Sequence, residues 1–465
     1  MTHVLLLSAP YVPYYMRNAR CDFVSLSRSQ WFPLWLGYLG AFLEGKGCRV
    51  TLIDAPAYGL DHAATEAAVA KAKPDFLVVY TGRLSEDNDV LFTDRLVDRL
   101  GVPAVFVGPY CSIAPERVLA KSRTVSAAVS GEFEHPVWEW LSGRDPSEIA
   151  NLLYKRDGEI VANPRRPYLS GEELDAMPFV SSFFARHLDY SRYRTPSEYH
   201  PFVDILAGRG CAWGRCTYCL WVHSFITGPV YNARSAANVA EEFVAIARDQ
   251  PRVRSVMLQD DTITDARARD LAQALLAVDN RLPWSCYARA DLALDTMKLM
   301  RRAGCRNLHV GFESASSDIL RNIKKGLSME RMTQFAAEAV QAGLRLHGDF
   351  AIGFPGETEA TAAATMDWAC AMRPHTAQFQ LMIPFPGTPF HADLEAKGWI
   401  RDGMAEYPGV SASRLEALAK QAYRRYYLSP WFARQVLRHP VELLFSRLST
   451  YVRAVPSIFW KRYVR

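Results

Sequence analysis

The sequence predicts an α/β protein with two successive units: an N-terminal doubly wound parallel sheet and a partial (β/α)6 barrel, followed by a helical C-terminal region. Two observations lead to this expectation. Short apolar runs alternate with helical patterns through the first third of the chain and again between about residues 200 and 390, and strands that alternate with helices form parallel sheets. Glycine or polar residues follow nearly every apolar run. They would lie at the carboxyl ends of the strands, where parallel sheets bind ligands.

The first unit covers residues 1–145 and contains five apolar runs that we expect to form strands. A helical pattern around residues 35–43 separates the first two runs and ends at Gly45 and Gly47, because glycine readily terminates a helix. The expected strands are His3–Leu7, Arg49–Asp54, Phe76–Tyr80, Ala104–Val107 and Val125–Val129.

Residues 146–200 are expected to connect the two units, since several prolines interrupt any long helix there. Asp157-Gly158 between two short runs predicts a β-hairpin within this connector. The barrel is expected over residues 201–400, with polar or glycine residues at its strand ends, where barrels build active sites. Its six strands are expected near residues 202–207, 253–258, 284–291, 307–314, 347–358 and 377–382.

Composition restricts where the protein works. No stretch reaches the roughly 18 to 20 apolar residues of a membrane-spanning helix, and the run Val4–Leu7 is too short for a signal-peptide core. The nine cysteines follow no regular disulfide framework, which fits a reducing compartment. We therefore expect a cytoplasmic protein.

The whole chain has a net charge of +5, and its basic character comes from the C-terminal region, residues 401–465. From Gln421 to Arg465 there are nine Lys or Arg residues and one acid, Glu442, together with many aromatic and aliphatic residues. Basic helices with an apolar face suit an anionic membrane surface, so peripheral membrane contact is one expectation. Packing of that face on the barrel is the alternative. Nucleic-acid binding is not expected, because no basic patch continues into the barrel.

Three cysteines, Cys211, Cys216 and Cys219, lie within nine residues on a glycine-punctuated loop after the first barrel strand. Thiolates at this spacing converge on a metal more readily than they form disulfides. Iron–sulfur clusters normally take four cysteine ligands, so three would leave one iron open to another molecule. A Cys3His zinc site that includes His223, in a binding module without catalysis, is the alternative.

This loop, with the aromatic Tyr218 between its last two cysteines, resembles the cluster motif of radical S-adenosylmethionine (SAM) enzymes. In that family the open iron of a [4Fe–4S] cluster binds SAM, and an electron from the cluster cleaves SAM to a 5′-deoxyadenosyl radical. The usual spacing is three residues and then two, whereas Cys211 and Cys216 enclose four, as some branches tolerate. The resemblance implies a catalytic cluster on Cys211, Cys216 and Cys219 and an external electron donor of the flavodoxin or ferredoxin type.

The ends of the later barrel strands resemble the SAM site of this family in order. Asp260 and Asp261 are expected to accept hydrogen bonds from the SAM ammonium, and Glu313 from the ribose hydroxyls. Arg289 offers a planar charged fork to the carboxylate. Taken singly, such groups are more often helix caps or turn residues. The resemblance implies SAM contacts by Tyr218, Gln259, Asp260, Asp261, Arg289, Glu313, Ser314, Gly348, Ile352, Gly353 and Pro384.

The first unit resembles the Rossmann-like, cobalamin-binding-type domain that precedes the barrel in one large radical SAM branch. The shared features are the Gly108-Pro109 turn, Pro115-Glu116 and Gly131-Glu132. The Asp-x-His-x-x-Gly sequence that supplies a cobalt-ligating histidine in methionine-synthase-type sites is absent, as is common in this branch. A sheet that has lost its cofactor is the alternative. If cobalamin binds, the resemblance implies contacts by Thr81, Gly108, Pro109, Gly131 and Glu132.

Three further segments, Asn322–Gly326, His347–Phe350 and Pro384–Thr388, narrow the resemblance. They are similar to the branch of the anaerobic protoporphyrin ester cyclase and the hopanoid-modifying enzymes, above all the hopanoid cyclitol-ether-forming group. The implied reaction begins with hydrogen abstraction from an unactivated carbon of an apolar substrate (lipid, isoprenoid or hopanoid-like) or a secondary metabolite. It ends in cobalamin-dependent C-methylation or in rearrangement or ring formation.

Overall fold

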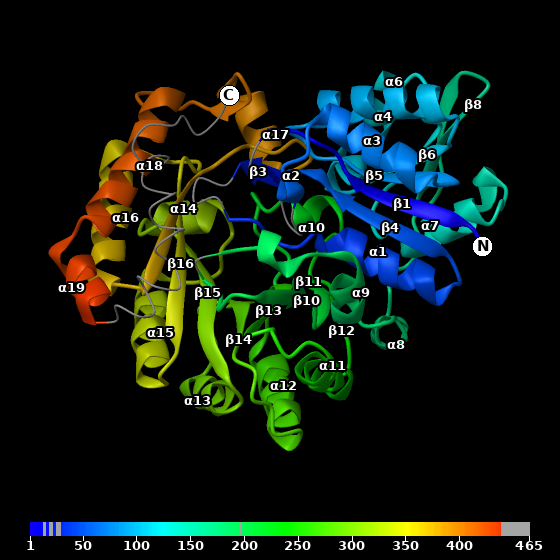
Figure 1. Cartoon of the computed structure of the whole chain (residues 1–465). Helices are drawn as coiled ribbons and strands as arrows, with labels where there is room; N and C mark the ends of the chain where they lie inside the picture. Colours follow the sequence, from blue (N-terminus) through cyan, green and yellow to red (C-terminus); the bar gives the residue numbers. More distant parts are fainter. Residues whose placement is uncertain (13–14, 18–21, 25–28, 196, 439–465) are drawn as a thin grey trace.

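The computed structural model describes residues 1–12, 15–17, 22–24, 29–195 and 197–438, and it confirms the predicted fold class. Two large sheets lie side by side, the N-terminal one in blue and cyan and the barrel in green to orange (Figure 1). Within these residues, no helix is both long enough and apolar enough to cross a membrane.

The N-terminal sheet has the strand order β4-β1-β5-β6-β7-β8-β9, and its first five strands are parallel. All five runs predicted as strands form them. This order is that of a doubly wound sheet of the flavodoxin type, which binds ligands at its carboxyl edge. The strands are β1 (His3–Ser8), β4 (Arg49–Asp54), β5 (Phe76–Tyr80), β6 (Ala104–Val107), β7 (Ala127–Val129), β8 (Leu152–Arg156) and β9 (Glu159–Ala162).

The hairpin that we placed in the connector extends this sheet instead. β8 and β9 turn at Asp157 and Gly158, which both have positive φ values (53° and 86°), and β8 pairs antiparallel with β7. The reason is hydrophobic: Leu152 and Leu153 of β8 are buried against the sheet. A second small hairpin joins β2 (Tyr15–Arg17) and β3 (Asp22–Val24).

Helix α1 (Leu34–Gly45) lies between the two units. Every residue from Leu34 to Leu43 is buried, so the helix has no solvated face. Gly37 and Gly40 allow the rings of Phe184 and Phe183 to pack directly on its backbone, because a Cβ at either position would overlap those rings. The other helices of this part are α2 (Ala55–Tyr58), α3 (His62–Ala72), α4 (Glu86–Leu100), α5 (Pro109–Ile113), α6 (Pro115–Lys121), α7 (Glu134–Leu141), α8 (Gly171–Asp175) and α9 (Val180–His187).

The barrel sheet consists of six parallel strands in chain order, as predicted, with helices on its outer face (Figure 1). The strands are β10 (Phe202–Ile205), β13 (Ser255–Ile263), β14 (Trp284–Ala288), β15 (Cys305–Glu313), β16 (Arg345–Ile352) and β17 (Thr376–Leu381). The helices are α10 (Trp221–Ser224), α11 (Ala236–Asp249), α12 (Asp265–Ala277), α13 (Leu294–Arg302), α14 (Ser317–Asn322), α15 (Met329–Gln341) and α16 (Glu359–Met372).

The described part of the C-terminal region packs on the barrel. Helix α17 (Pro389–Ala396) follows the last barrel strand, and after it come the hairpin of β18 (Ile400–Arg401) and β19 (Met404–Ala405), α18 (Ala412–Tyr427) and α19 (Pro430–Arg438). Tyr426 and Phe432 are buried, and the Tyr427 hydroxyl donates to the carbonyl of Ala377 on β17 at 2.7 Å. For these residues the packing alternative holds. Residues 439–465, which carry most of the predicted basic tail, lie outside the described residues.

Candidate active site

The cysteine loop follows a short strand, β11 (Gly208–Gly210), and neighbouring backbone packs closely against the glycines of this segment. β11 pairs antiparallel with β12 (Tyr231–Ala233). Gly210 has a φ of 87°, and a Cβ there would overlap the carbonyl oxygen of Val230. Gly214 has a φ of 55°, and a Cβ there would overlap the backbone of Gly228. Only glycine fits these positions, so the path of the loop is fixed by its backbone.

The three cysteines of the loop are half-buried free thiols. The backbone N–H of Gly214 points to Cys211 Sγ at 3.5 Å. Burial raises the pKa of Cys219 to about 12, and burial also raises the pKa of Cys216, although the nearby Lys325 ammonium opposes that rise. A bound metal would stabilise the thiolates and lower both pKa values. These thiols would therefore lose their protons when metal binds.

His223, the fourth ligand of the zinc alternative, has another partner. Its Nε2 lies 3.0 Å from the carbonyl oxygen of Cys216. Among the residues that the structure describes, no three His, Cys, Asp or Glu side chains gather around one point as ligands of a single metal ion. A cubane cluster differs in that its cysteines bind separate irons.

The segment Asn322–Gly326, which begins at the end of α14, clamps the cysteine loop. Trp213 Nε1 donates to the carbonyl of Lys324 at 2.9 Å. The guanidinium of Arg289 stacks on the Trp213 ring, 4.6 Å from its centroid, and donates to the carbonyl of Lys325 at 3.1 Å. Arg289, predicted to bind the SAM carboxylate, therefore lies beside the loop and also stiffens this clamp.

Glu313 joins the loop to the same clamp. Its Oε1 accepts hydrogen bonds from the Tyr218 hydroxyl and from Lys325 Nζ, both at 2.8 Å. Lys325 is buried, with 7% of its surface exposed, and its charge lies near Cys216. Glu313 adopts a left-handed backbone with a φ of 62°, which turns its carboxylate toward the loop. The predicted Tyr218 and Glu313 are thus in direct contact, and the same carboxylate oxygen also binds Lys325, which sequence reasoning did not single out.

The three polar residues at the end of β13 have different environments. Asp260 is buried and accepts hydrogen bonds from the Tyr231 hydroxyl and the Ala207 N–H, both at 2.7 Å, while burial raises its pKa. It therefore fixes the path between β10 and β12. Gln259 is also buried and hydrogen bonds to Asp204. Asp261 is half-buried, and its charge contributes to the raised pKa of Cys219.

The turn after β16 also reaches the loop. Phe354, which follows Gly353, packs edge-on against the Tyr218 ring with centroids 4.9 Å apart. Gly353 has a φ of 105°, and its N–H donates to Glu357 Oε2 at 2.9 Å. The other predicted SAM contacts, Ser314, Gly348, Ile352 and Pro384, are buried.

The inner face of the barrel is polar. Tyr287, His309, His347 and Thr376 occupy one row across β14, β15, β16 and β17, because the strand register aligns them. The rings of Tyr287 and His309 lie 5.0 Å apart, those of His309 and His347 lie 4.9 Å apart, and His347 Nδ1 is 2.7 Å from Thr376 Oγ1. His347 Nε2 also lies 3.4 Å from Asp349 Oδ1 in the next layer. A substrate that enters the barrel would meet hydrogen-bonding groups.

The five residues predicted to contact cobalamin lie at the carboxyl edge of the N-terminal sheet, and all are buried. Thr81 Oγ1 donates to the carbonyl of Val107 at 3.1 Å, and Gly108 (φ 113°) lies directly against the Thr81 backbone. Glu132 is paired with Arg209 of the barrel unit. These contacts shape the edge, and they present no open polar group to a corrin ring.

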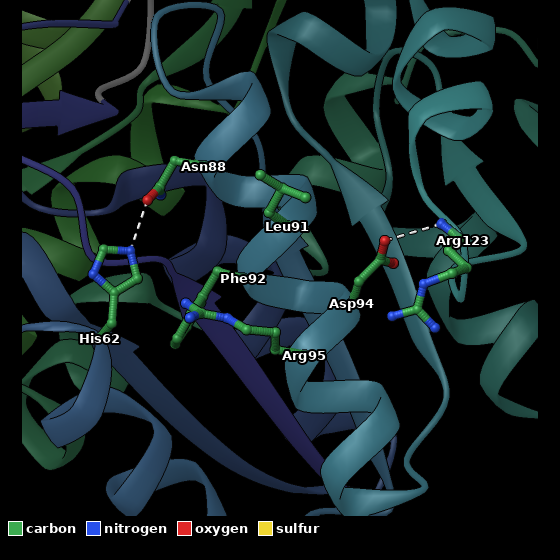
Figure 2. A pocket seen from close by; sticks show the side chains of 7 residues that line it. All are labelled: His62, Asn88, Leu91, Phe92, Asp94, Arg95 and Arg123. Atoms are coloured by element: carbon green, nitrogen blue, oxygen red, sulfur yellow. Dashed lines mark hydrogen bonds between the residues drawn. The ribbon is translucent and has the colours of Figure 1, made fainter.

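A pocket on the N-terminal unit lies away from these groups. Figure 2 shows that its side chains do not converge: His62 turns to Asn88, 2.7 Å away, while Asp94 accepts from the backbone N–H of Arg123 beyond helix α4. Its lining contains no cysteine and no residue of the predicted site. The pocket is lined by His62, Asn88, Leu91, Phe92, Asp94, Arg95 and Arg123.

Residues 205–369, from the end of the first barrel strand, β10, to helix α16, match the Radical SAM superfamily. This match covers the cysteine loop, Asp260, Arg289, Glu313 and Gly353 together. The barrel unit of this chain is a radical SAM domain. The protein is a radical SAM enzyme, and the cofactors of its superfamily are a [4Fe–4S] cluster and SAM. The zinc-binding module without catalysis is thereby excluded.

Relatives of this radical SAM enzyme include methyltransferases and a cyclase. An uncharacterized methyltransferase of Pyrococcus horikoshii is 27% identical over 86% of this chain and 88% of its own. Cytidylyl-2-hydroxyethylphosphonate methyltransferase of Streptomyces wedmorensis is 24% identical, over 79% of each chain. The anaerobic magnesium-protoporphyrin IX monomethyl ester cyclase of Cereibacter sphaeroides is 22% identical over 86% of this chain and 69% of its own.

Two solved structures share the fold of both units. The radical SAM methyltransferase TsrM from Kitasatospora setae, with tryptophan and a SAM analogue bound, has a TM-score of 0.69 and 20% identity over 92% of this chain and 83% of its own. The cobalamin-dependent SAM radical enzyme OxsB, with aqua-cobalamin and SAM bound, has a TM-score of 0.71 and 14% identity over 98% of this chain and 71% of its own. The two-unit arrangement is thus the shared architecture.

The residues around the loop fit the radical SAM cofactors. Three half-buried thiols on one loop supply three cluster ligands, and cationic and anionic side chains stand beside them for the charged groups of SAM. Sequence reasoning missed two members of this site, Lys325 and Trp213. The only signal for Lys325 was its place in the Asn322–Gly326 segment, and for Trp213 its place between two cysteines.

Proposed function

We propose that this radical SAM enzyme cleaves SAM at a [4Fe–4S] cluster on Cys211, Cys216 and Cys219 and abstracts hydrogen from an unactivated carbon of its substrate. The observation that carries the proposal is the convergence of Tyr218 and Lys325 on Glu313 beside the cysteine loop. When bound, the cluster supplies the electron that splits SAM into methionine and a 5′-deoxyadenosyl radical.

The side chains of the chain have separate tasks in this proposal. Lys325 places a buried positive charge near Cys216, which stabilises anionic ligands there. Glu313 uses Oε1 for its two donors, so Oε2 is the oxygen that would accept a ribose hydroxyl. Arg289 offers its guanidinium to the SAM carboxylate, and Asp261 its carboxylate to the SAM ammonium.

We further propose an amphipathic substrate of the lipid, isoprenoid or hopanoid-like class, or a secondary metabolite with similar character. The polar row of Tyr287, His309, His347 and Thr376 supports a hydrogen-bonding group at the reacting end. Leu437 and Arg434 of α19 are exposed, and the basic tail of the sequence follows them. These residues support contact of the protein with a membrane surface, where the apolar end of such a substrate would lie. Sedimentation of the full chain with anionic and with zwitterionic vesicles tests this contact, and equal absence from both pellets would refute it.

Two outcomes of the substrate radical are proposed. The names of the methyltransferase relatives and the cobalamin in the OxsB structure support a cobalamin-dependent methyl transfer. The cyclase relative and the engaged carboxyl edge of the N-terminal sheet support rearrangement or ring formation. Anoxic purification with hydroxocobalamin, followed by absorbance and S-adenosylhomocysteine assays, separates them. Methyl transfer requires both bound cobalamin and S-adenosylhomocysteine.

The radical chemistry itself is tested without the substrate. Anoxically reconstituted protein is expected to absorb broadly in the visible range and, with SAM and a strong reductant, to release 5′-deoxyadenosine. In the cell the reductant would be a flavodoxin or ferredoxin, and the eight described cysteines, all free thiols, support a cytoplasmic location. A variant with all three loop cysteines changed to alanine should lose both signals. Release of 5′-deoxyadenosine by that variant would refute the assignment.

A further inference from the structure

A buried arginine joins the cysteine loop to the N-terminal unit. Arg209 is the central residue of β11, two positions before Cys211, and only 3% of its surface is exposed. Its Nη1 donates to Glu132 Oε1 at 2.8 Å and its Nη2 to Glu134 Oε1 at 2.7 Å. Both glutamates belong to the N-terminal unit, in the loop after β7 and at the start of α7.

The surroundings hold this arginine in one orientation. Its guanidinium lies 4.6 Å from the ring centroid of Trp35 and 5.3 Å from that of Tyr38, both on α1. Glu132 is itself fixed, because its Oε2 accepts the N–H of Leu169 at 2.8 Å. A planar guanidinium held by two carboxylates and two rings has very little rotational freedom. The β11 backbone that carries Arg209 is therefore held in one orientation as well.

We propose that Arg209 is a positioning residue for the iron–sulfur cluster: its fork on Glu132 and Glu134 orients β11 so that Cys211 meets the cluster. The inference rests on the proposed function of the cysteine loop. β11 has a second anchor through β12, where Tyr231 donates to Asp260, but that anchor lies within the barrel. Arg209 alone among the residues of β11 ties the loop to the N-terminal unit through charged groups in the described part of the chain. Docking of that unit thereby sets the geometry of the first cluster ligand.

Arg209 pairs with two buried carboxylates, so replacing one of them by an amide changes the charge of the group that adjoins the cysteine loop. A negative charge disfavours addition of an electron. The geometry and the charge can be varied separately. Arg209→Met removes the fork, Arg209→Lys keeps the charge with one donor group in place of two, and Glu134→Gln keeps the shape but removes one negative charge.

The test compares full-length variants after anoxic reconstitution. The matched control is Arg17→Met, because Arg17 is an equally buried arginine paired with Asp89 within the N-terminal unit. Iron content, the electron paramagnetic resonance spectrum of the reduced cluster with and without SAM, and the midpoint potential are measured for each. R209M is expected to bind less than half the iron of the wild type or to show a changed spectrum. R209K should recover part of the loss, and R17M should match the wild type.

R209K keeps the proposal testable if R209M does not fold, because it retains the buried charge and loses one donor group. E134Q keeps the fork and is expected to leave the iron content unchanged. Wild-type iron content and spectrum in a folded R209M, or in R209K where R209M does not fold, would refute the proposal and leave the proposed function intact. A wild-type chain that takes up no iron–sulfur cluster would refute both together.

Discussion

At the scale of single residues, Glu313 is the group on which the site depends most. One of its carboxylate oxygens accepts from both Tyr218 and Lys325, and its left-handed φ of 62° is unusual for a residue with a side chain. Such a conformation costs of the order of 1–3 kcal/mol and persists only where surrounding contacts hold it. The Tyr218 and Lys325 hydrogen bonds are contacts of that kind.

The first prediction concerns the lysine of this group. Lys325→Met should lower the rate of 5′-deoxyadenosine release by at least about tenfold, because loss of one partner from a buried ion pair costs roughly 3–5 kcal/mol and frees the Glu313 carboxylate to move. The rate is measured by chromatography of reactions with SAM and reductant. The control is Lys324→Met, since Lys324 is exposed and holds the loop through its backbone carbonyl. Equal rates for both variants would contradict the role of Lys325.

The second prediction concerns pH. Burial raises the pKa of Asp54 from 3.8 to about 6, against the opposing effects of the Arg17 charge and the hydrogen bond from Tyr193. The folded carboxyl therefore holds its proton more tightly than the unfolded one. Its contribution to stability is complete below pH 3.8 and is lost as the pH rises through about 6, a change of about 3 kcal/mol.

Asp54→Asn removes this titration, because an amide cannot lose the proton. Urea unfolding at about pH 4.5 and about pH 7.5 should therefore show a smaller loss of stability for D54N than for the wild type over this interval. Other titrating groups are common to both proteins and cancel in the comparison. Parallel pH profiles for the two proteins would show that Asp54 is charged in the fold.

At the scale of secondary structure, the β11–loop–β12 unit depends on glycines with positive φ. Gly210→Ala should abolish most cluster incorporation, because its Cβ would displace the Val230 carbonyl and so the start of the cysteine loop. Iron analysis after reconstitution measures the effect. Gly47→Ala is the matched control: its φ of 82° is equally unfavourable for alanine, but a Cβ there meets no atom within 4 Å. G47A should lose about 1 kcal/mol of stability and keep its iron.

At the scale of the whole molecule, helix α1 determines how the two units meet. The ring of Phe183 lies where a side chain on Gly40 would have to go. Gly40→Leu should therefore destabilise the chain by about 3 kcal/mol or more, since overpacking forces the helix away from α9. Adding Phe183→Ala should restore part of the loss by making room. Chemical denaturation of both single variants and the double variant measures the coupling, and strict additivity would contradict direct packing.

Much of the fold and part of the site were predictable, for a common physical reason. Alternation of apolar runs with helical patterns is a local property, and it predicted all five parallel strands of the first sheet and the six of the barrel. Cys211, Cys216, Cys219 and Tyr218 are neighbours in the chain, so their proximity follows from the sequence. The Glu313–Lys325 pair was not predictable in this way, because it depends on which turn faces the loop.

The amino-acid sequence alone determined the order of strands and helices, the glycine-bound cysteine loop and hence the radical SAM chemistry, because each rests on residues close together in the chain. Only the tertiary structure decided that Asp260 is buried and holds a backbone path while Asp261 is half-buried and contributes to the raised pKa of Cys219. It also decided that Glu132, predicted as a cobalamin contact, is held by Arg209 of the other unit. Partners of buried charges are chosen by long-range packing, and two carboxylates that look alike in sequence acquire different roles once different neighbours surround them.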